Sequence, residues 1–205
     1  MPIIRDGKSL VGGQRNGKAL KAVFFGDKQV WGAFTPTLVT VDVPGPYSVP
    51  WVSGATKCDV VLASCGGPGQ GQWDPMPTAA TTCTGVGSAT APTTGTYAAT
   101  TGAGEDMPDK HYNGQIYPGA AGGAPATGGG QTAGDGQQPG AGGGGDAVLN
   151  SLRGGKCGQW FATTITTPQT FTGTIPTPAT PAYGGFFTPG KGGGGIAHFY
   201  FYADT

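Results

Sequence analysis

Apolar and polar residues alternate along several short stretches of the chain, and each stretch predicts an extended strand. Residues 37–43 read Thr-Leu-Val-Thr-Val-Asp-Val, the Pro-Gly-Pro sequence at 44–46 marks a turn, and residues 47–52 resume an extended path. Alternation with a period of two is typical of a strand with one buried face. This part of the chain therefore predicts a strand, a turn and a second strand.

The strongest strand pattern covers residues 56–65. Cys58, Val60 and Leu62 would lie on one face of this strand, and the residues between them would lie on the other. Glycines and Pro68 follow directly, so the strand ends abruptly. Three further strand patterns occur near the other end of the chain, at 157–167, 169–175 and 196–202.

The first 35 residues predict a small unit of β-hairpins. Asp6-Gly7 and Gly26-Asp27 are two-residue turn signals, each lying between short apolar stretches. A unit of this size buries little apolar surface, so its large apolar side chains need a partner to cover them. We therefore interpret residues 1–35 as a docking segment, with these predicted contacts: Phe24, Phe25, Val30 and Trp31.

Residues 66–150 are dominated by small and polar residues. The 205 residues of the chain include 42 glycines and 18 prolines, which disfavours helix almost everywhere. Such a segment can be ordered as parallel polyproline-II-like helices with three residues per turn, whose glycines let neighbouring backbones touch. In steps of three from Gly119 to Gly143, six of nine positions are glycine, against three and four in the other registers. This period favours the polyproline-II-like arrangement.

These elements predict an all-β fold. Each strand is too short to be stable alone, so we expect the segments 37–65 and 155–205 to combine as one antiparallel β-sandwich, with 66–150 as a glycine-rich loop insertion. The predicted domains are the hairpin docking segment 1–35 and the glycine-rich sandwich 36–205. The predicted core consists of Val60, Leu62, Trp160, Ile165, Phe199 and Phe201.

Charge and hydropathy narrow the choice of partners. Charged residues make up 11% of the chain, and 11 basic side chains balance 11 acidic ones, so the basic excess of a nucleic-acid-binding protein is missing. The sequence has no apolar run of about 18 residues to span a bilayer, and its N-terminus lacks the apolar core of a signal peptide. We therefore expect no nucleic-acid partner and no membrane insertion.

Candidate catalytic groups are few. The chain has two histidines: His111 lies beside Asp109 and Tyr112 in the low-complexity region, and His198 lies in the last predicted strand. A catalytic site would offer a nucleophile with a base, paired carboxylates or a metal cluster, and we interpret neither histidine as a catalytic group. The four cysteines show no CxxC pair, so we interpret them as free or partly buried thiols in preference to disulfides or metal ligands: Cys58, Cys65, Cys83 and Cys157.

Three glycine motifs suggest binding sites but have simpler explanations. Residues 12–19 lack the Ser or Thr of a phosphate-binding loop, and 67–71 is not followed by a helix start, so we interpret them as a hairpin and as close backbone packing. Residues 142–146 hold one aspartate, too few for a calcium-binding repeat. We expect no catalytic, cofactor or metal site, and we expect that the protein is not an enzyme. One acidic loop is interpreted as solvated in preference to a cation site: Glu105, Asp106 and Asp109.

The order of the motifs resembles the glycine-rich domain of minor tail proteins from siphophages of the mycobacteriophage kind. The resemblance rests on three motifs. These are Val-Pro-Trp at 49–51, Cys-Asp-Val-Val-Leu at 58–62 before a glycine-rich stretch, and four glycines at 192–195 directly before the final strand. Residues 22–31, an aromatic strand with a glycine turn and Val-Trp, resemble an N-terminal repeat of phage tail proteins. The region 73–109 departs from the pattern, being richer in threonine, proline and acidic residues.

This resemblance implies a protein of the phage tail, assembled in the host cytoplasm. The implied partners are other phage tail proteins, copies of the same chain in a trimer, and a glycan of the host cell surface. We expect a structural minor tail protein at the tail tip or fibre that contributes to host attachment. The alternatives are a purely architectural virion protein of the tail or head, and a bacterial cell-surface glycine-rich adhesin. Because aromatic residues on loops suit binding, the candidate host contacts are Trp73, Tyr112 and Tyr117.

Overall fold

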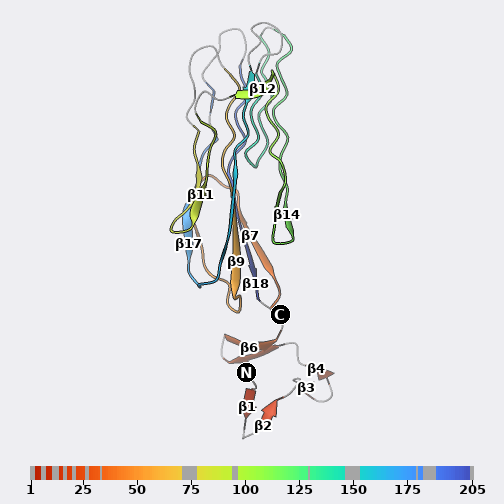
Figure 1. The fold of residues 1–205 in the computed structure, drawn as a ribbon, viewed down its shortest axis with the longest axis vertical. Helices are drawn as coiled ribbons and strands as arrows, with labels where there is room; N and C mark the ends of the chain where they lie inside the picture. The colour runs from red at the N-terminus through yellow and green to blue at the C-terminus, as the bar shows by residue number, and fades with distance from the viewer. Residues whose placement is uncertain are drawn as a thin grey trace.

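Strands and extended segments make up the described structure (Figure 1). In this computed structural model the described residues contain no helix, which confirms the predicted all-β fold. The described residues are 3–5, 8–10, 14–15, 18–19, 22–25, 28–32, 34–70, 78–93, 97–128, 130–145, 153–178, 180–181 and 188–203.

The first of two four-stranded sheets holds the longest strands. Its order is β16–β9–β18–β7, and all neighbours are antiparallel. The central pair places Val60 opposite Phe199 and Cys58 opposite Phe201. The sheet therefore joins strands from the two distant segments that the sequence predicts to combine. Its strands are β7 (Thr37–Val41), β9 (Lys57–Ala63), β16 (Trp160–Ile165) and β18 (Ile196–Tyr202).

The second sheet includes a hairpin that the sequence analysis did not predict. Its order is β11–β10–β17–β8, again antiparallel. The hairpin β10–β11 comes from inside the stretch expected to be a loop insertion, where its threonine-rich sequence hides the alternation. Cys83 and Ala89 nevertheless face the core. The strands are β8 (Gly45–Val49), β10 (Thr81–Cys83), β11 (Gly87–Ala89) and β17 (Phe171–Ile175).

The two sheets enclose a core of aromatic and branched side chains. The ring of Phe199 lies 5.0 Å from that of Phe171 and meets Tyr47 edge to face at 5.7 Å, measured between centroids. Such pairs add to the free energy gained by burying the rings. The predicted core residue Ile165 packs against one buried cluster of the sandwich. Four other predicted core residues are confirmed as members of that cluster: Val60, Leu62, Phe199 and Phe201.

The core prediction for Trp160 is wrong. Side chains alternate along β16, so Trp160 and Ile165, five positions apart, point to opposite faces of the sheet. Phe161 and Ile165 pack against the sandwich core, whereas Trp160 packs against a second cluster with Met107 and Ala141. Its indole Nε1 donates to the carbonyl of Pro108 at 2.8 Å. Trp160 therefore joins the sandwich to the glycine-rich region.

A short hairpin covers the outer face of the first sheet. It is formed by β13 (Lys110–Tyr112) and β14 (Gln115–Tyr117), which are antiparallel. The ring of Tyr117 packs against that of His198 of β18, with the centroids 5.1 Å apart and the planes tilted by 40°. The cover explains why both faces of β9 are buried, including Asp59.

Three small hairpins lie near the N-terminus, and their side chains are outside the described part of the structure. The hairpin β3–β4 spans the glycine motif at 12–19, which agrees with its interpretation as a hairpin and not a phosphate-binding loop. The strands are β1 (Ile3–Arg5), β2 (Lys8–Leu10), β3 (Gln14–Arg15), β4 (Lys18–Ala19), β5 (Ala22–Phe25) and β6 (Lys28–Gly32).

Candidate functional site

The glycine-rich region is a bundle of extended segments that continues the molecule beyond the sandwich (Figure 1). One more short pair, β12 (Tyr97–Thr101) with β15 (Arg153–Gly155), lies within this region. Two segments, 153–158 and 188–195, lie outside the predicted insertion 66–150 and still pack with it. The segments are 64–70, 102–108, 119–126, 131–137, 140–145, 153–158 and 188–195.

The central segment, 140–145, has backbone hydrogen bonds that repeat every three residues. The N–H groups of Gly142 and Gly145 both donate to segment 102–108. The N–H of Gly143 donates to segment 64–70. The other pairs show the same spacing. The N–H groups of Ala141 and Gly144 donate to segment 131–137, and their carbonyls accept from segment 188–195. The carbonyls of Gly142 and Gly145 accept from segment 119–126, and those of Gly140 and Gly143 accept from segment 153–158.

This pattern is that of a polyproline-II-like helix bonded to six neighbours. Three residues per turn bring every third backbone group back to the same side. A β-strand, by contrast, bonds to two neighbours with a period of two. The three-residue period predicted from the sequence is confirmed. The predicted parallel arrangement is only partly right, because segment 119–126 runs parallel to the central segment and 102–108 runs antiparallel to it.

Close backbone contact explains the glycine content of the bundle. A Cβ atom added to Gly142 would lie far inside van der Waals contact with the carbonyl of Gly155. The same holds for Gly144 against Ala124 and for Gly193 against Gln137. These neighbouring atoms are backbone and cannot rotate away. The bundle is therefore held at a spacing that only glycine permits at these positions.

Carboxylate side chains accept hydrogen bonds from backbone N–H groups at the margins of the bundle. The carboxylate of Glu105 accepts from the N–H of Cys157 at 3.0 Å, that of Asp106 from Gly122 at 2.7 Å, and that of Asp109 from Gly119 at 2.7 Å. These three residues are the acidic loop considered as a cation site. Their carboxylates instead bond to backbone N–H groups of neighbouring chain. Within the described residues, no group of three or more His, Cys, Asp or Glu side chains is placed to hold a metal ion.

The end of the bundle remote from the sandwich collects the borders of several undescribed stretches. Gln70 and Arg153 are joined there by a backbone hydrogen bond, and Gly145 bonds to Gly102. Residues 71–77 follow Gln70, 146–152 lie between Gly145 and Arg153, and 94–96 precede β12, which pairs with β15. Trp73, a candidate host contact, falls in the first of these stretches and lies outside the described residues.

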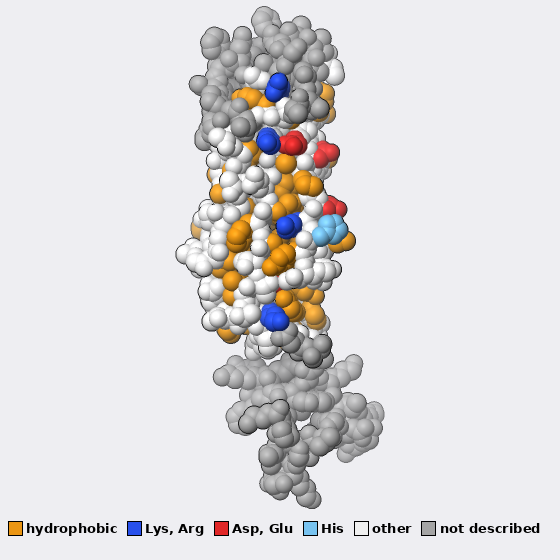
Figure 2. All heavy atoms as spheres, in the orientation of Figure 1, with side chains coloured by type: hydrophobic (Ala, Val, Ile, Leu, Met, Phe, Trp, Pro, Cys, Tyr) orange, Lys and Arg blue, Asp and Glu red, His pale blue; other side chains and the backbone are white. Residues whose placement is uncertain are grey.

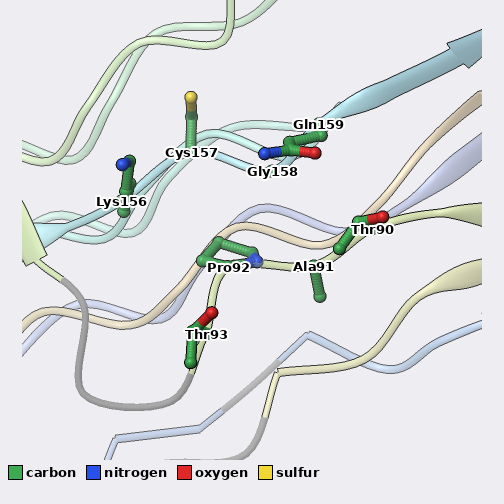
Figure 3. Close-up of a pocket in the computed structure, with 8 residues that line it drawn as sticks. All are labelled: Thr90, Ala91, Pro92, Thr93, Lys156, Cys157, Gly158 and Gln159. Atoms are coloured by element: carbon green, nitrogen blue, oxygen red, sulfur yellow. The ribbon is translucent and has the colours of Figure 1, made fainter.

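A groove of about 240 Å³ lies beside segment 153–158 of the bundle (Figure 3). It is lined by the two segments 90–93 and 156–159. The described lining residues offer hydroxyl, amide and ammonium groups from Thr90, Gln159 and Lys156, and none of them is a carboxylate or an imidazole. These residues can therefore contact a polar molecule, and no acid–base pair is found among them.

The two other candidate host contacts lie on the hairpin over the sheet. Tyr112 is half-buried, and its hydroxyl lies 3.1 Å from Thr164 Oγ1. Tyr117 is only 3% exposed, and burial followed by the charge of Asp59 raises the pKa of its phenol. Its ring packs inside the contact between hairpin and sheet, where a ligand on the surface does not reach it. Tyr117 therefore serves the packing of the hairpin.

The predicted docking residues lie on β5 and β6. The register sets Val23 opposite Trp31, and Phe24 opposite Gln29, with an irregularity between the two pairs. Phe25 lies opposite Lys28 at the turn. The side chains of this hairpin are outside the described structure, so docking stays a prediction.

The four cysteines are free thiols, of which three are buried and Cys157 is half-buried. Burial, and then the Glu105 carboxylate, raise the pKa of Cys157 to about 11. Burial also raises the pKa of Cys65 to about 11. A thiol with a pKa this high stays protonated at neutral pH and is a poor nucleophile.

His198 provides a testable link between pH and stability. Burial lowers its pKa to about 4, against a smaller opposing effect of Asp42, and Nδ1 lies 2.9 Å from Thr40 Oγ1. The unfolded chain therefore binds a proton between pH 6.5 and 4 that the folded chain does not. Stability should fall by about 3 kcal/mol as the pH drops through this window.

The measurement is urea unfolding at pH 7, 5 and 4 for the wild type and His198→Gln. The variant keeps a polar group near Thr40 but does not titrate, so its loss of stability on acidification should be smaller by the amount above. Equal pH dependence of the two proteins would contradict the assignment to His198.

The described surface carries no large patch of one charge on the face drawn in Figure 2. Lys and Arg side chains lie apart from one another along this face, and a few acidic side chains lie among them. Among the described residues, none forms a helix with the length and hydropathy of a transmembrane span. Comparison of the chain with protein-family models, with curated proteins and with solved structures finds no match.

Proposed function

We propose that this chain is a structural minor tail protein of a bacteriophage, located at the tail tip or fibre, which contributes to attachment to the host surface. The observation that carries the proposal is the central segment 140–145, bonded through its backbone to six neighbours. Backbone packing of this kind forms a stiff rod that depends little on side chains. A rod of that kind suits a protein that holds a binding end away from its point of assembly.

The chain path gives the rod one end suited to binding. Neighbouring segments run in both directions, so the chain returns repeatedly to the end remote from the sandwich. Variable connections on a fixed scaffold are where binding residues concentrate in many folds. The proposed host contact at Trp73 follows Gln70, which lies at this end. The proposed ligand is a glycan of the host cell surface.

The opposite end is proposed to join the virion. The aromatic hairpin β5–β6 precedes the sandwich in sequence and has the composition of a docking element for other tail proteins. Assembly as a trimer would also cover the open edge of β7, where Leu38 is 54% exposed. These partners are part of the proposal.

Binding to host cell walls tests the proposal. Purified labelled protein is titrated onto walls of the bacterium that the phage infects, and saturable binding is expected. Trp73→Ala should weaken binding roughly tenfold or more, as loss of a central aromatic contact does. The matched control is Ile116→Ala, because Ile116 is 60% exposed on the hairpin over the sheet, away from the bundle end.

The outcomes separate attachment from architecture. A chain that is incorporated into virions but shows no saturable wall binding would be an architectural protein. Equal weakening by both variants would exclude a specific contact at Trp73. Absence of the chain from purified virions, checked with an antibody against it, would exclude a tail protein altogether.

A further inference from the structure

Three polar side chains meet where the hairpin β13–β14 lies on the first sheet. Thr164 Oγ1 donates to Asp59 Oδ1 at 2.7 Å. The side-chain amide of Asn113, at the hairpin turn, donates from Nδ2 to Thr164 Oγ1 at 3.0 Å and to Asp59 Oδ1 at 3.1 Å. A hydroxyl, a carboxylate and a carboxamide are thus within mutual hydrogen-bond reach.

The surroundings hold this arrangement in place. Asp59 is fully buried, and Tyr202 donates its hydroxyl to the same Oδ1 at 3.1 Å. Asp59 Oδ2 has no hydrogen-bond partner within the described structure. Asn113 has a positive φ of 46° and is followed by Gly114 at 77°, as in the tight turns that join antiparallel strands. The turn therefore fixes where the amide lies.

We propose that Thr164 and Asn113 form an intramolecular ester that ties the hairpin covalently to β16. The hydroxyl is the nucleophile, Asp59 is the general base, and Asn113 Cγ, one bond beyond Nδ2, is the carbon attacked. A nucleophile within hydrogen-bond reach of a buried base has the arrangement that nucleophilic chemistry requires. Because Nδ2–H points at Oγ1, the carboxamide of Asn113 must turn about its Cβ–Cγ bond to present Cγ, and the fixed neighbours keep the two groups at high effective concentration while it does so.

The atoms and protons balance without any other reactant. Asp59 Oδ1, which already accepts from Thr164, takes the proton as Oγ1 bonds to Asn113 Cγ. The carboxyl group then gives the proton to Nδ2, which lies 3.1 Å from Oδ1. The C–N bond breaks, ammonia leaves, and Asp59 returns to a carboxylate. No group is oxidised or reduced.

Mass spectrometry of the full-length wild-type protein tests the ester. The expected mass is lower than that of the sequence by one ammonia, after allowing for removal of Met1. Trypsin should release the peptides 111–153 and 157–191 as one joined species, since Asn113 lies in the first and Thr164 in the second. An unchanged mass after prolonged incubation, with two separate peptides, would overturn the proposal.

A second ammonia-losing reaction needs its own control. Asn113 precedes Gly114, and ring closure of such a pair onto the backbone also releases ammonia. That reaction leaves the peptides separate and is indifferent to residue 164. Thr164→Val should therefore abolish the joined species, and Thr164→Ser, which restores a hydroxyl, should recover it. Loss of ammonia with separate peptides, or a joined species in Thr164→Val, would refute the ester.

Discussion

Replacing Gly142 by alanine is expected to lower the free energy of unfolding by about 3 kcal/mol, at the upper end of what overpacking costs. The new Cβ would meet the carbonyl of Gly155 and lie near the N–H of Glu105, both of them backbone. No rotamer change relieves the contact. To admit the methyl group, the central segment must part from its neighbours and weaken several hydrogen bonds together.

Gly128→Ala is the matched control. A Cβ at Gly128 would meet only the flexible side chain of Gln131, at 3.6 Å. Its effect should be within about 1 kcal/mol, since alanine also restricts the unfolded chain. Urea unfolding followed by tryptophan fluorescence compares the two. If both variants unfolded at the same urea concentration as the wild type, the tight central packing would be wrong.

The contrast between these two glycines shows what the sequence reveals about the bundle. A strict period of three marks segments at the margin, where exposed positions such as Ala121 and Ala124 are free to carry side chains. A central segment is enclosed on every side and needs small residues throughout. The unbroken runs at 140–145 and 192–195 are buried at every position. The length of an unbroken run of small residues is thus a better indicator of the central segment than the three-residue period of glycine.

The strands of the sandwich were predictable because their alternation is strong. The patterns at 56–65 and 196–202 became β9 and β18, and their distant pairing followed from the need to bury one face of each. The hairpin β10–β11 was missed because threonine and glycine carry little hydrophobic contrast. Trp160 has the apolar character of a core residue, but it lies an odd number of positions from Ile165 along β16 and so faces the second cluster.

The extent of the bundle and the polar cluster at Asp59 could not be predicted from the sequence and became visible only in the structure. Every inner backbone group needs a partner, so the bundle recruits 153–158 and 188–195 from outside the predicted insertion. Asp59, Asn113 and Thr164 are far apart in sequence, and of the three only Asp59 lies in a motif noted in the sequence, the run at 58–62. The one available signal was Asp59 itself, a charged residue in the middle of the most apolar strand, which requires buried partners.

Phe199→Ala is expected to reduce the free energy of unfolding by about 3–5 kcal/mol, the usual cost of deleting a buried ring. Phe199 is fully buried between Phe171 and Tyr47, so the cavity cannot fill with solvent or collapse easily. The control is Leu38→Ala on the neighbouring strand β7, where the side chain is 54% exposed and the change should be within about 0.5 kcal/mol.

The variant Phe199→Ala also tests whether the sandwich and the bundle unfold together. Segment 188–195 runs directly into β18, and segment 64–70 directly follows β9, so the central strands of the first sheet continue as members of the bundle. Loss of packing at Phe199 should therefore lower the melting temperature of the whole molecule in a single transition. Hydrogen exchange gives the residue-level readout, with faster exchange expected at the amides of 140–145. If those amides kept wild-type protection while the sandwich melted early, the bundle would be an independent folding unit, and its stiffness would come from its own hydrogen bonds alone.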